Sequence, residues 1–526
     1  MTSILKYLNR ALLVLLLAAF AACSDNEGGN ESNGNGDDGN TETPADGDTY
    51  GYIKDTNGNS VEGVVVSDGY SCTATDAEGR YALTRNADAG FVFYSLPSAY
   101  KVSVDKNYKL PRFFARLQAG TARYDFTLEA LAAPEKRFDL ICIGDPQINE
   151  ASHAVRFKEE AGREIREYAA SAGVPCYGIT LGDHVNNKWT LFTNMVVALQ
   201  PEQTGVPVFA TIGNHDHEFP TADEKAARAK YESYFGPVDY SFNRGDVHVV
   251  SMDNVIHSCK ASADYEGGFT AAQYAWLKQD LSFVPKDKMV ILCVHIPFRG
   301  GWGTNSAHAD ADKYYDEVLD LLSQYEYAAI MSAHTHSNIN YIHRKNGKEI
   351  FEHVTGTTCG AWWRSTVCTE GTPIGFGLYR IDGNRMEEWA YRSVRHDEQF
   401  QIRLYRASDT FVGGAKYRFK QTGADQIVAN IWNWDPSWTV NVYENDVLSG
   451  QMTRNSDIDA WTVAYHIGLL NNTDSYRKSS DHMFHYTLKN PAAAVRVEAI
   501  DRFGNKYEQT VFTDPAEHPG DFHADF

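Results

Sequence analysis

The first apolar pattern in the chain consists of short runs separated by turn-forming segments. Between residues 49 and 130, runs such as 63–67 and 80–83 alternate with segments rich in Asp, Asn and Gly. Short strands joined by such turns are typical of antiparallel β-structure. The pattern predicts a small N-terminal β-sandwich over residues 49–130. Because no His, Cys or acidic cluster converges in it, we expect a spacer or packing domain, with glycan binding as the alternative.

A different pattern begins at residue 137, after a short linker. Near-continuous apolar runs, typical of strands covered on both faces, alternate with segments in which apolar residues recur at helical spacing. The alternation predicts a layered α/β domain over residues 137–394, with functional residues at the strand ends. The predicted strands are 138–143, 177–181, 206–212, 247–252, 289–294 and 327–331, and the predicted helices include 189–199, 271–283 and 314–322.

The layered pattern ends near residue 394, after a hairpin signalled by Asp382 and Gly383. The remaining residues, 395–526, contain strand-like runs such as 426–432 and 494–499. These runs predict a β-rich C-terminal domain, in which we find no further catalytic set. The sequence as a whole therefore predicts a multidomain protein with a central α/β domain between two β-domains.

The first 48 residues read as a targeting segment and a tether. Lys6 and Arg10 precede an apolar run, 11–22, that is too short to span a bilayer. The ending Phe-Ala-Ala-Cys at 20–23 resembles the lipobox of bacterial lipoproteins, which implies lipidation of Cys23. An ordinary secretory signal is the alternative. Residues 24–48 are acidic, rich in Gly and Asn and nearly free of apolar residues, so we expect a solvated tether.

Charge and cysteine content narrow the possible partners and the compartment. The formal net charge of -21 argues against binding to nucleic acid, which requires a basic face. Seven cysteines remain when Cys23 is set aside, and Cys142, Cys176 and Cys293 lie in apolar runs typical of buried free thiols. Cys359 and Cys368 flank a polar loop, where a disulfide and two free thiols are both open.

Five predicted strands of the central domain are followed by polar clusters. An amide oxygen can bind a divalent cation, an imidazole can donate a proton, and a carboxylate can fix the tautomer of that imidazole. Alone, each Asp could be a helix cap and each His a core residue, but their joint position at strand ends favours a metal site. The clusters are Gly-Asp-Pro-Gln at 144–147, Gly-Asp-His at 182–184, Gly-Asn-His-Asp at 213–216, His295, and Ala-His-Thr-His at 333–336.

In this order, the clusters resemble the signature of the calcineurin-like metallophosphoesterases, over residues 137–395. The extra N- and C-terminal β-domains and the lipobox resemble a Bacteroidetes-type lipoprotein subgroup of that family. The resemblance implies two divalent metal ions, Mn, Fe or Zn, because mixed imidazole and oxygen ligands suit these metals. It assigns the first metal to Asp145, Gln147, Asp183 and His336, and the second to Asp183 as a bridge, Asn214, His295 and His334.

The resemblance also implies a mechanism, in which a metal-bridged hydroxide attacks phosphorus in line. His215 would be the histidine that binds no metal and assists the leaving oxygen, and Asp216 would orient it. The chain departs from the family pattern at Gln147, where a His is usual, and at Ala333, where a Gly is usual. His184 and His217 lie beside the motif residues, either as supporting contacts or as surface histidines.

Two loops are candidates for the substrate pocket. Arg299 follows His295 by four residues, so it could contact a phosphate oxygen or lie in solvent. The Gly-rich loop 355–364 carries Trp362 and Trp363, which are costly to expose to water unless they pack or bind a ring.

We therefore expect a bimetal-dependent hydrolase of phosphate mono- or diesters, acting outside the cytoplasm. Its partners would be a phosphorylated small molecule or a glycan-linked phosphate, with no nucleic acid and with membrane contact through the lipid anchor alone. The expected location is the bacterial cell envelope, at the outer membrane, on either face. The alternatives are a hydrolase of phosphoanhydrides, such as nucleotides or pyrophosphate, and a catalytically weak surface lipoprotein that binds glycans or a protein partner.

Overall fold

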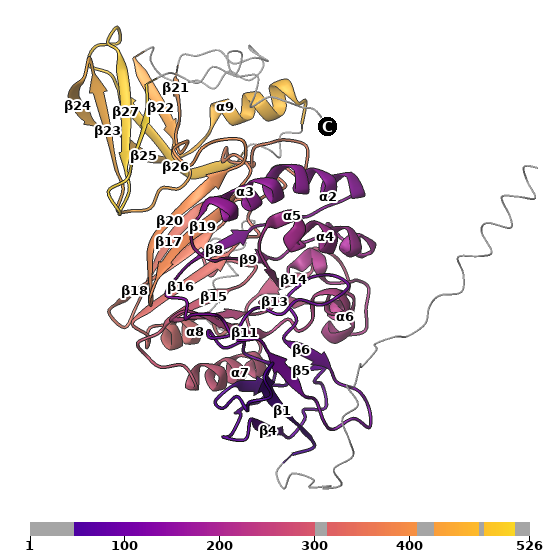
Figure 1. Ribbon diagram of the computed structural model, residues 1–526. Helices are drawn as coiled ribbons and strands as arrows, with labels where there is room; N and C mark the ends of the chain where they lie inside the picture. Colours follow the sequence, from indigo (N-terminus) through magenta and orange to yellow (C-terminus); the bar gives the residue numbers. More distant parts are fainter. Residues whose placement is uncertain (1–46, 300–312, 408–424, 473–477, 511–526) are drawn as a thin grey trace, which may run out of the picture. The chain divides into compact units, whose positions relative to one another are not determined.

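The computed structural model describes residues 47–299, 313–407, 425–472 and 478–510 of the 526-residue chain. The predicted signal segment with Cys23 and nearly all of the tether lie outside these residues. None of the helices in the described ranges is long and apolar enough to cross a membrane. Three successive groups of β-sheets follow one another along the described chain, the second of them interleaved with helices (Figure 1). This layout confirms the predicted multidomain fold.

The N-terminal β-domain contains two small sheets with the strand orders β4-β1-β7 and β3-β2-β5-β6. Burial alternates along the first half of β1, as expected for a strand with one face on a core. Ile53, Val66, Phe93 and Leu128, drawn from both sheets, belong to one hydrophobic core. The strands are β1 (Thr49–Asp55), β2 (Val65–Ser67), β3 (Cys72–Ala74), β4 (Arg80–Leu83), β5 (Phe91–Tyr94), β6 (Phe114–Arg116) and β7 (Phe126–Leu128).

Two larger sheets form the central domain. The first has the order β10-β9-β8-β19-β20 and the second the order β11-β12-β15-β16-β18-β17. Neighbouring strands are parallel from β8 to β10 and again from β12 through β15 and β16 to β18. The first sheet comprises β8 (Arg137–Ile143), β9 (Cys176–Leu181), β10 (Val208–Thr211), β19 (Gly375–Asp382) and β20 (Arg385–Ser393). The second comprises β11 (Tyr240–Arg244), β12 (Val247–Ser251), β15 (Met289–Cys293), β16 (Tyr327–Ser332), β17 (Ile339–Lys345) and β18 (Lys348–Val354).

Both faces of β8 are buried, in two different cores. Leu140 and Cys142 share a core with Leu292 of the second sheet. Ile141, which points to the other face because side chains alternate along a strand, shares a core with Phe192 of a helix. This double coverage explains the near-continuous apolar run of this strand in the sequence.

Helices cover the outer faces of the central domain. Apolar side chains of α7 and α8, including Trp276 and Val318, belong to the core that contains the second sheet. The predicted helices at 271–283 and 314–322 are confirmed, whereas the predicted helix at 189–199 begins with a 3-10 turn, Trp189–Leu191. The helices are α2 (Ala151–Phe157), α3 (Arg163–Ser171), α4 (Phe192–Ala198), α5 (Pro201–Thr204), α6 (Glu224–Phe235), α7 (Ala271–Ser282) and α8 (Tyr315–Leu322).

The C-terminal β-domain contains two four-stranded sheets, β21-β22-β26-β25 and β24-β23-β27-β28. Leu404, Ile427, Val442 and Val497 contribute to the core between them. The outer face of the first sheet packs against α9 (Ala460–Val463) through a second, smaller core. The strands are β21 (Arg403–Arg406), β22 (Gln426–Asn430), β23 (Thr439–Glu444), β24 (Val447–Gln451), β25 (Thr453–Ile458), β26 (Ser479–Thr487), β27 (Val495–Ile500) and β28 (Lys506–Gln509).

Candidate metal centre

The predicted metal-binding residues lie in loops directly after parallel strands. Asp145, Asp183 and Asn214 follow β8, β9 and β10 of the first sheet, and His295 and His334 follow β15 and β16 of the second. Functional residues of parallel sheets gather at these carboxyl ends. The two sheets together therefore supply all five loops.

Backbone conformation marks the same residues. The φ angles of Asp145, Gln147, Asp183, His334 and His336 all lie between 37° and 65°, in the left-handed region. A residue other than Gly in this region costs on the order of 1–3 kcal/mol, and such residues cluster at functional sites. The surrounding structure holds these side chains in place against that cost.

Two glycines allow the loops to approach closely. A Cβ atom at Gly213 would lie 2.3 Å from Oδ1 of Asp183, and one at Gly182 would lie 2.4 Å from Nδ1 of His295. Any side chain at either position would push the metal-binding loops apart. These contacts give a physical reason for Gly in the Gly-Asp and Gly-Asn-His-Asp motifs.

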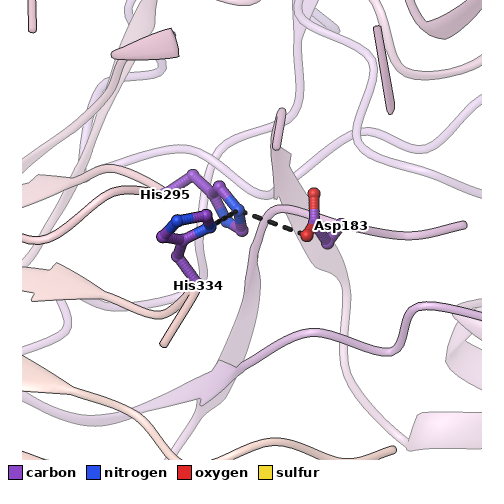
Figure 2. A group of neighbouring side chains, drawn as sticks. All are labelled: Asp183, His295 and His334. Atoms are coloured by element: carbon purple, nitrogen blue, oxygen red, sulfur yellow. Dashed lines mark hydrogen bonds and ion pairs between the residues drawn. The ribbon is translucent and has the colours of Figure 1, made fainter. Parts of the chain in front are cut away.

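One group of candidate ligands surrounds the ring of His295. Its Nδ1–H donates to the carbonyl of Leu181 at 2.7 Å, so Nε2 faces the other ligands. This Nε2 lies 3.1 Å from Nδ1 of His334 and 3.3 Å from Oδ2 of Asp183 (Figure 2). It also lies 2.9 Å from Oδ1 of Asn214. Metal–ligand bonds of about 2.0–2.2 Å place neighbouring ligands roughly 3 Å apart. The ligand atoms of Asp183, His295 and His334 all lie within 4.8 Å of one another, and Asn214 lies beside His295, as expected for ligands of one cation.

The electrostatics of this group also fit a cation. Burial lowers the pKa of His334 well below its usual value, so its ring stays neutral and keeps a lone pair. Burial opposes ionisation of Asp183, but the neighbouring His295 and His215 outweigh it and hold the pKa of Asp183 below its usual value. In the absence of a cation, the charge of Asp183 raises the pKa of His295 to about 9 against the effect of burial. A bound cation would replace that imidazolium charge.

The second group contains Asp145, Gln147 and His336. Oδ1 of Asp145 and Oε1 of Gln147 are buried and have no hydrogen-bond partner among the residues that the structure describes. Nε2 of His336 lies 3.7 Å from Oδ1 of Asp145, and the amide of Gln147 donates to Oδ2 of Asp183 at 3.4 Å. A buried oxygen without a partner costs about 1–3 kcal/mol, so these atoms fit a bound ion. Both groups reach Asp183, in agreement with its expected position as a bridge.

Protonation in the second group follows burial. Burial, together with the charge of Asp183, raises the pKa of Asp145 well above its usual value. Burial also lowers the pKa of His336 to about 3, so its ring is neutral at pH 7. Mixed carboxylate, amide and imidazole ligands of this kind suit Mn, Fe or Zn.

His215 contacts Asp183 through its backbone and Asn187 through its ring. Its backbone N–H donates to Oδ1 of Asp183 at 2.9 Å. Its ring Nδ1 lies 2.8 Å from Oδ1 of Asn187, whose amide donates to Ser262. With Nδ1–H donating to Asn187, Nε2 is the nitrogen available to a substrate. Asn187 was missed in the sequence, where its position four residues after Asp183 was the only signal.

The prediction that Asp216 orients His215 is wrong. Asp216 accepts the ring Nδ1–H of His184 at 2.9 Å and backbone N–H groups of His184, Val185 and Gly213. Its carboxylate therefore joins the Gly-Asn-His-Asp loop to the Gly-Asp-His loop. The reason is geometric, because the side chains of Asn214, His215 and Asp216 leave a 3-10 turn in different directions.

His184 and His217 are buried supporting residues, and the surface alternative is wrong for both. Nε2 of His184 accepts from the hydroxyl of Thr180 at 2.8 Å. His217 donates to the carbonyl of Gly213 and to Asp253, at 2.9 and 3.1 Å. Although burial opposes protonation, the charge of Asp253 raises the pKa of His217.

The two candidate Trp residues have different environments. Trp363 is buried, donates to the carbonyl of Pro146 at 2.8 Å and stacks on His153 at 5.3 Å, so it supports the loop of Asp145 and Gln147. Trp362 is half-buried, and its ring centre lies 4.8 Å from that of His336. Trp362, which is partly exposed beside the candidate ligand His336, therefore stays a candidate for substrate contact.

The other loop candidate, Arg299, is exposed, and its guanidinium lies 5.6 Å from the ring centre of Tyr341. No described contact therefore brings it to the metal-binding loops. The residues that follow it, 300–312, lie outside the described part of the chain.

A second residue that the sequence did not reveal is Tyr265. It lies on the hairpin of β13 (Val255–His257) and β14 (Tyr265–Gly267), and its hydroxyl lies 3.3 Å from Nε2 of His334. Strands of three residues carry too little periodicity to be recognised in a sequence.

The structure answers the question left open for Cys359 and Cys368. Both thiols are free and buried. Burial raises the pKa of each thiol above its usual value. These side chains therefore act as small apolar groups beside the loop of Trp362 and Trp363.

Comparison with known families agrees with this geometry. The sequence model described as "Calcineurin-like phosphoesterase" matches residues 124–338, which include all five loops. The chain belongs to the calcineurin-like phosphoesterases. Models for the N-terminal and C-terminal parts of calcineurin-like phosphoesterases match residues 48–131 and 352–507, so both flanking β-domains are also features of this family.

Individual relatives are distant. The chain is 26% identical to purple acid phosphatase 23 and 25% identical to purple acid phosphatase 18 of Arabidopsis thaliana, over 31% and 32% of its length. It spans only 36% and 38% of those two proteins. Among solved structures, a 5'-nucleotidase from Candida albicans matches with a TM-score of 0.31 and 12% identity, over 50% of this chain and 52% of the other.

Proposed function

We propose that this calcineurin-like phosphoesterase hydrolyses phosphate mono- or diesters with two divalent cations bound at the centre. The single observation that carries the proposal is the convergence of buried ligand atoms from five loops, among them two oxygens without a hydrogen-bond partner in the described residues. Asp145, Gln147, Asp183 and His336 would hold one cation. Asp183, Asn214, His295 and His334 would hold the other.

The cations, when bound, would polarise the phosphoryl group and make water a stronger nucleophile. The remaining chemistry belongs to side chains of this protein. His215 presents Nε2, where it can stabilise charge on a phosphoryl oxygen or donate a proton to the departing oxygen. Asn187 keeps the ring in that orientation, and Trp362 offers a flat surface to the rest of the substrate.

Metal analysis combined with a substrate panel tests this function. The purified protein is expected to contain up to two equivalents of Mn, Fe or Zn. It should hydrolyse p-nitrophenyl phosphate or bis(p-nitrophenyl) phosphate, and the faster of the two would indicate a monoesterase or a diesterase. Asp183→Asn serves as the inactive control. A protein that binds no divalent metal and hydrolyses neither compound in Mn, Fe or Zn would contradict the proposal.

A phosphoanhydride substrate is the second candidate. The half-buried ring of Trp362 beside His336 favours it, because a nucleobase could stack there. Hydrolysis of nucleoside di- and triphosphates can be compared with hydrolysis of sugar phosphates and glycerophosphodiesters. If nucleotides are preferred, Trp362→Ala should raise KM for nucleotides more than for pyrophosphate, which has no ring.

The glycan-binding alternative has less support, because Trp363 and Trp432 are buried and unavailable to a sugar. The envelope location remains a proposal that rests on the first 23 residues. Labelling of cells with a radioactive fatty acid should mark the protein, and Cys23→Ala should abolish the label. An unlabelled parent protein would favour an ordinary secretory signal instead.

A further inference from the structure

We propose that the C-terminal β-domain is a positioning part of the metal centre, because through Asn338 it fixes the loop that carries His334 and His336. The inference rests on the proposed metal-dependent function. Asn338 lies two residues after His336 and directly before β17, at the end of that loop. It is fully buried, and both ends of its side chain are in use.

The amide group of Asn338 connects two domains. Its Nδ2 donates to the backbone carbonyl of Trp432, in the C-terminal domain, at 2.8 Å. Its Oδ1 accepts from the backbone N–H of Gly356 at 3.1 Å and from Nε2 of His353 at 2.7 Å. Because a backbone carbonyl can only accept and a backbone N–H can only donate, these contacts fix the orientation of the amide. Asn338 cannot rotate without breaking one of them.

The backbone of Asn338 is held as well. Its N–H donates to Oε1 of Glu370 at 2.9 Å. Thr372 donates to both oxygens of Glu370, at 2.6 and 2.7 Å, and Nε2 of His482 lies 3.8 Å away. Although burial raises the pKa of Glu370, these contacts outweigh it and keep the pKa below its usual value. A charged carboxylate therefore accepts from the loop of metal-binding histidines.

The segment around Glu370 is in turn fastened to the C-terminal domain. Asn430 donates to the carbonyl of Glu370 at 3.2 Å and to Oδ2 of Asp459 at 2.9 Å. Arg403 donates to the carbonyl of Gly371 at 2.6 Å. Gly371 cannot be replaced here, because a Cβ would lie 2.4 Å from Nδ2 of Asn430.

This support matters because the supported loop is strained. His334 and His336 both have positive φ angles, and a segment in that conformation relaxes unless its surroundings hold it. Asn338, which accepts and donates these hydrogen bonds, lies two residues after His336, where the loop leads into β17. Contacts that orient metal ligands in this way typically change metal affinity by about 10–100-fold when they are removed.

Asn340 provides a matched control. It is also a buried Asn, two residues further along, and it donates to the carbonyls of Asn433 and Trp434 at 2.9 and 3.2 Å. It therefore joins the same two domains through the same segment, 432–434. Its side chain makes no described hydrogen bond to the metal-binding loops.

The experiment titrates metal-free protein with Mn²⁺ or Zn²⁺ and follows binding by calorimetry, alongside thermal unfolding. Asn338→Ala should bind metal about 10–100-fold more weakly. Asn340→Ala should bind it like the parent, although it also loses thermal stability through its lost contacts to residues 433 and 434. Asn338→Asp keeps the oxygen that faces Gly356 and His353 but loses the donor to Trp432, so it should also bind metal more weakly.

If Asn338→Ala loses thermal stability but binds metal with the affinity of the parent, the inference is overturned, because a merely structural contact would behave in that way. Parent-like affinity in Asn338→Asp would also overturn it, since the C-terminal domain would then contribute nothing. Failure of the parent protein itself to bind metal would contradict the proposed function, and the two failures are therefore distinguishable.

Discussion

Two buried pairs of the same chemical kind behave differently in this molecule. Asp145 with Gln147, and Glu370 with Asn338, each combine a carboxylate and a primary amide, and all four residues are at most 2% exposed. Every side-chain oxygen and nitrogen of the second pair has a hydrogen-bond partner. In the first pair, Oδ1 of Asp145 and Oε1 of Gln147 have none within the described chain.

Backbone conformation separates the pairs in the same way. Asp145 and Gln147 have positive φ angles, whereas Glu370 and Asn338 do not. Residue type and burial therefore do not distinguish a binding site from a structural network. Buried ligand atoms that lack a hydrogen-bond partner and lie at strained backbone positions do distinguish a binding site. Both features are unfavourable in the described chain alone and are explained if a ligand binds there.

The largest expected effect is that of Asp183→Asn. Activity should fall at least ~10³-fold, because metal catalysis supplies several kcal/mol of stabilisation to the transition state and Asp183 serves both ligand groups. Metal content, measured by elemental analysis, should fall with it. The metal-free variant should unfold at a lower temperature than the metal-free parent, because the charge of Asp183, which His295 and His215 stabilise, has been removed. Full activity in the variant would exclude Asp183 as a bridge.

His215→Ala should give the next largest effect. The rate should fall about 10²-fold or more, the usual contribution of a positioned acid or base. Metal content should remain close to that of the parent, because the hydrogen bond from His215 to Asp183 comes from the backbone N–H, which the substitution keeps. A variant with parental rates on every hydrolysed compound would contradict this role.

Much of this organisation could be predicted from the sequence. The five loops could be placed because each follows an apolar strand, and parallel strands bring their carboxyl ends to one edge. Resemblance to a family supplied the expected ligands. The strands and the polar residues that follow them are local features of the sequence, and the five clusters follow the order that is known in the family.

The partners of these residues could not be predicted, because they depend on the direction of side chains. Asp216 follows His215 directly, yet it contacts His184, whereas Asn187 contacts His215 from 28 residues away. Asn338 meets Trp432 across 94 residues. Neither the period of a strand nor that of a helix carries information over such separations.

Asp459 belongs to the hydrogen-bonded network around Glu370 but makes no described contact with Asn338, so its substitution should change stability and not catalysis. Asp459→Ala removes acceptors for Asn430, Thr462 and the backbone N–H of Trp461. Leaving such buried donors without a partner should lower the free energy of unfolding by about 1–3 kcal/mol. Chemical denaturation measures this loss, while kcat should stay within about twofold, because the residue does not contact the metal-binding loops. A loss of activity larger than that of Asn338→Ala would contradict the contrast between the two clusters.

The smallest expected effect concerns pH and His353, which donates to Asn338. Burial lowers the pKa of His353 to about 3, whereas an unfolded histidine titrates near ~6.5. Below that value the unfolded chain binds a proton that the folded chain excludes, so stability falls as the pH falls. Between pH 6.5 and 5, this group should remove about 1.5–2 kcal/mol. Denaturation of the parent and of His353→Gln, both with a chelator, should show a shallower pH dependence in the variant. Equal slopes would mean that His353 takes up a proton as readily in the folded protein as in the unfolded chain. That result would contradict the low pKa expected for its buried ring beside Asn338.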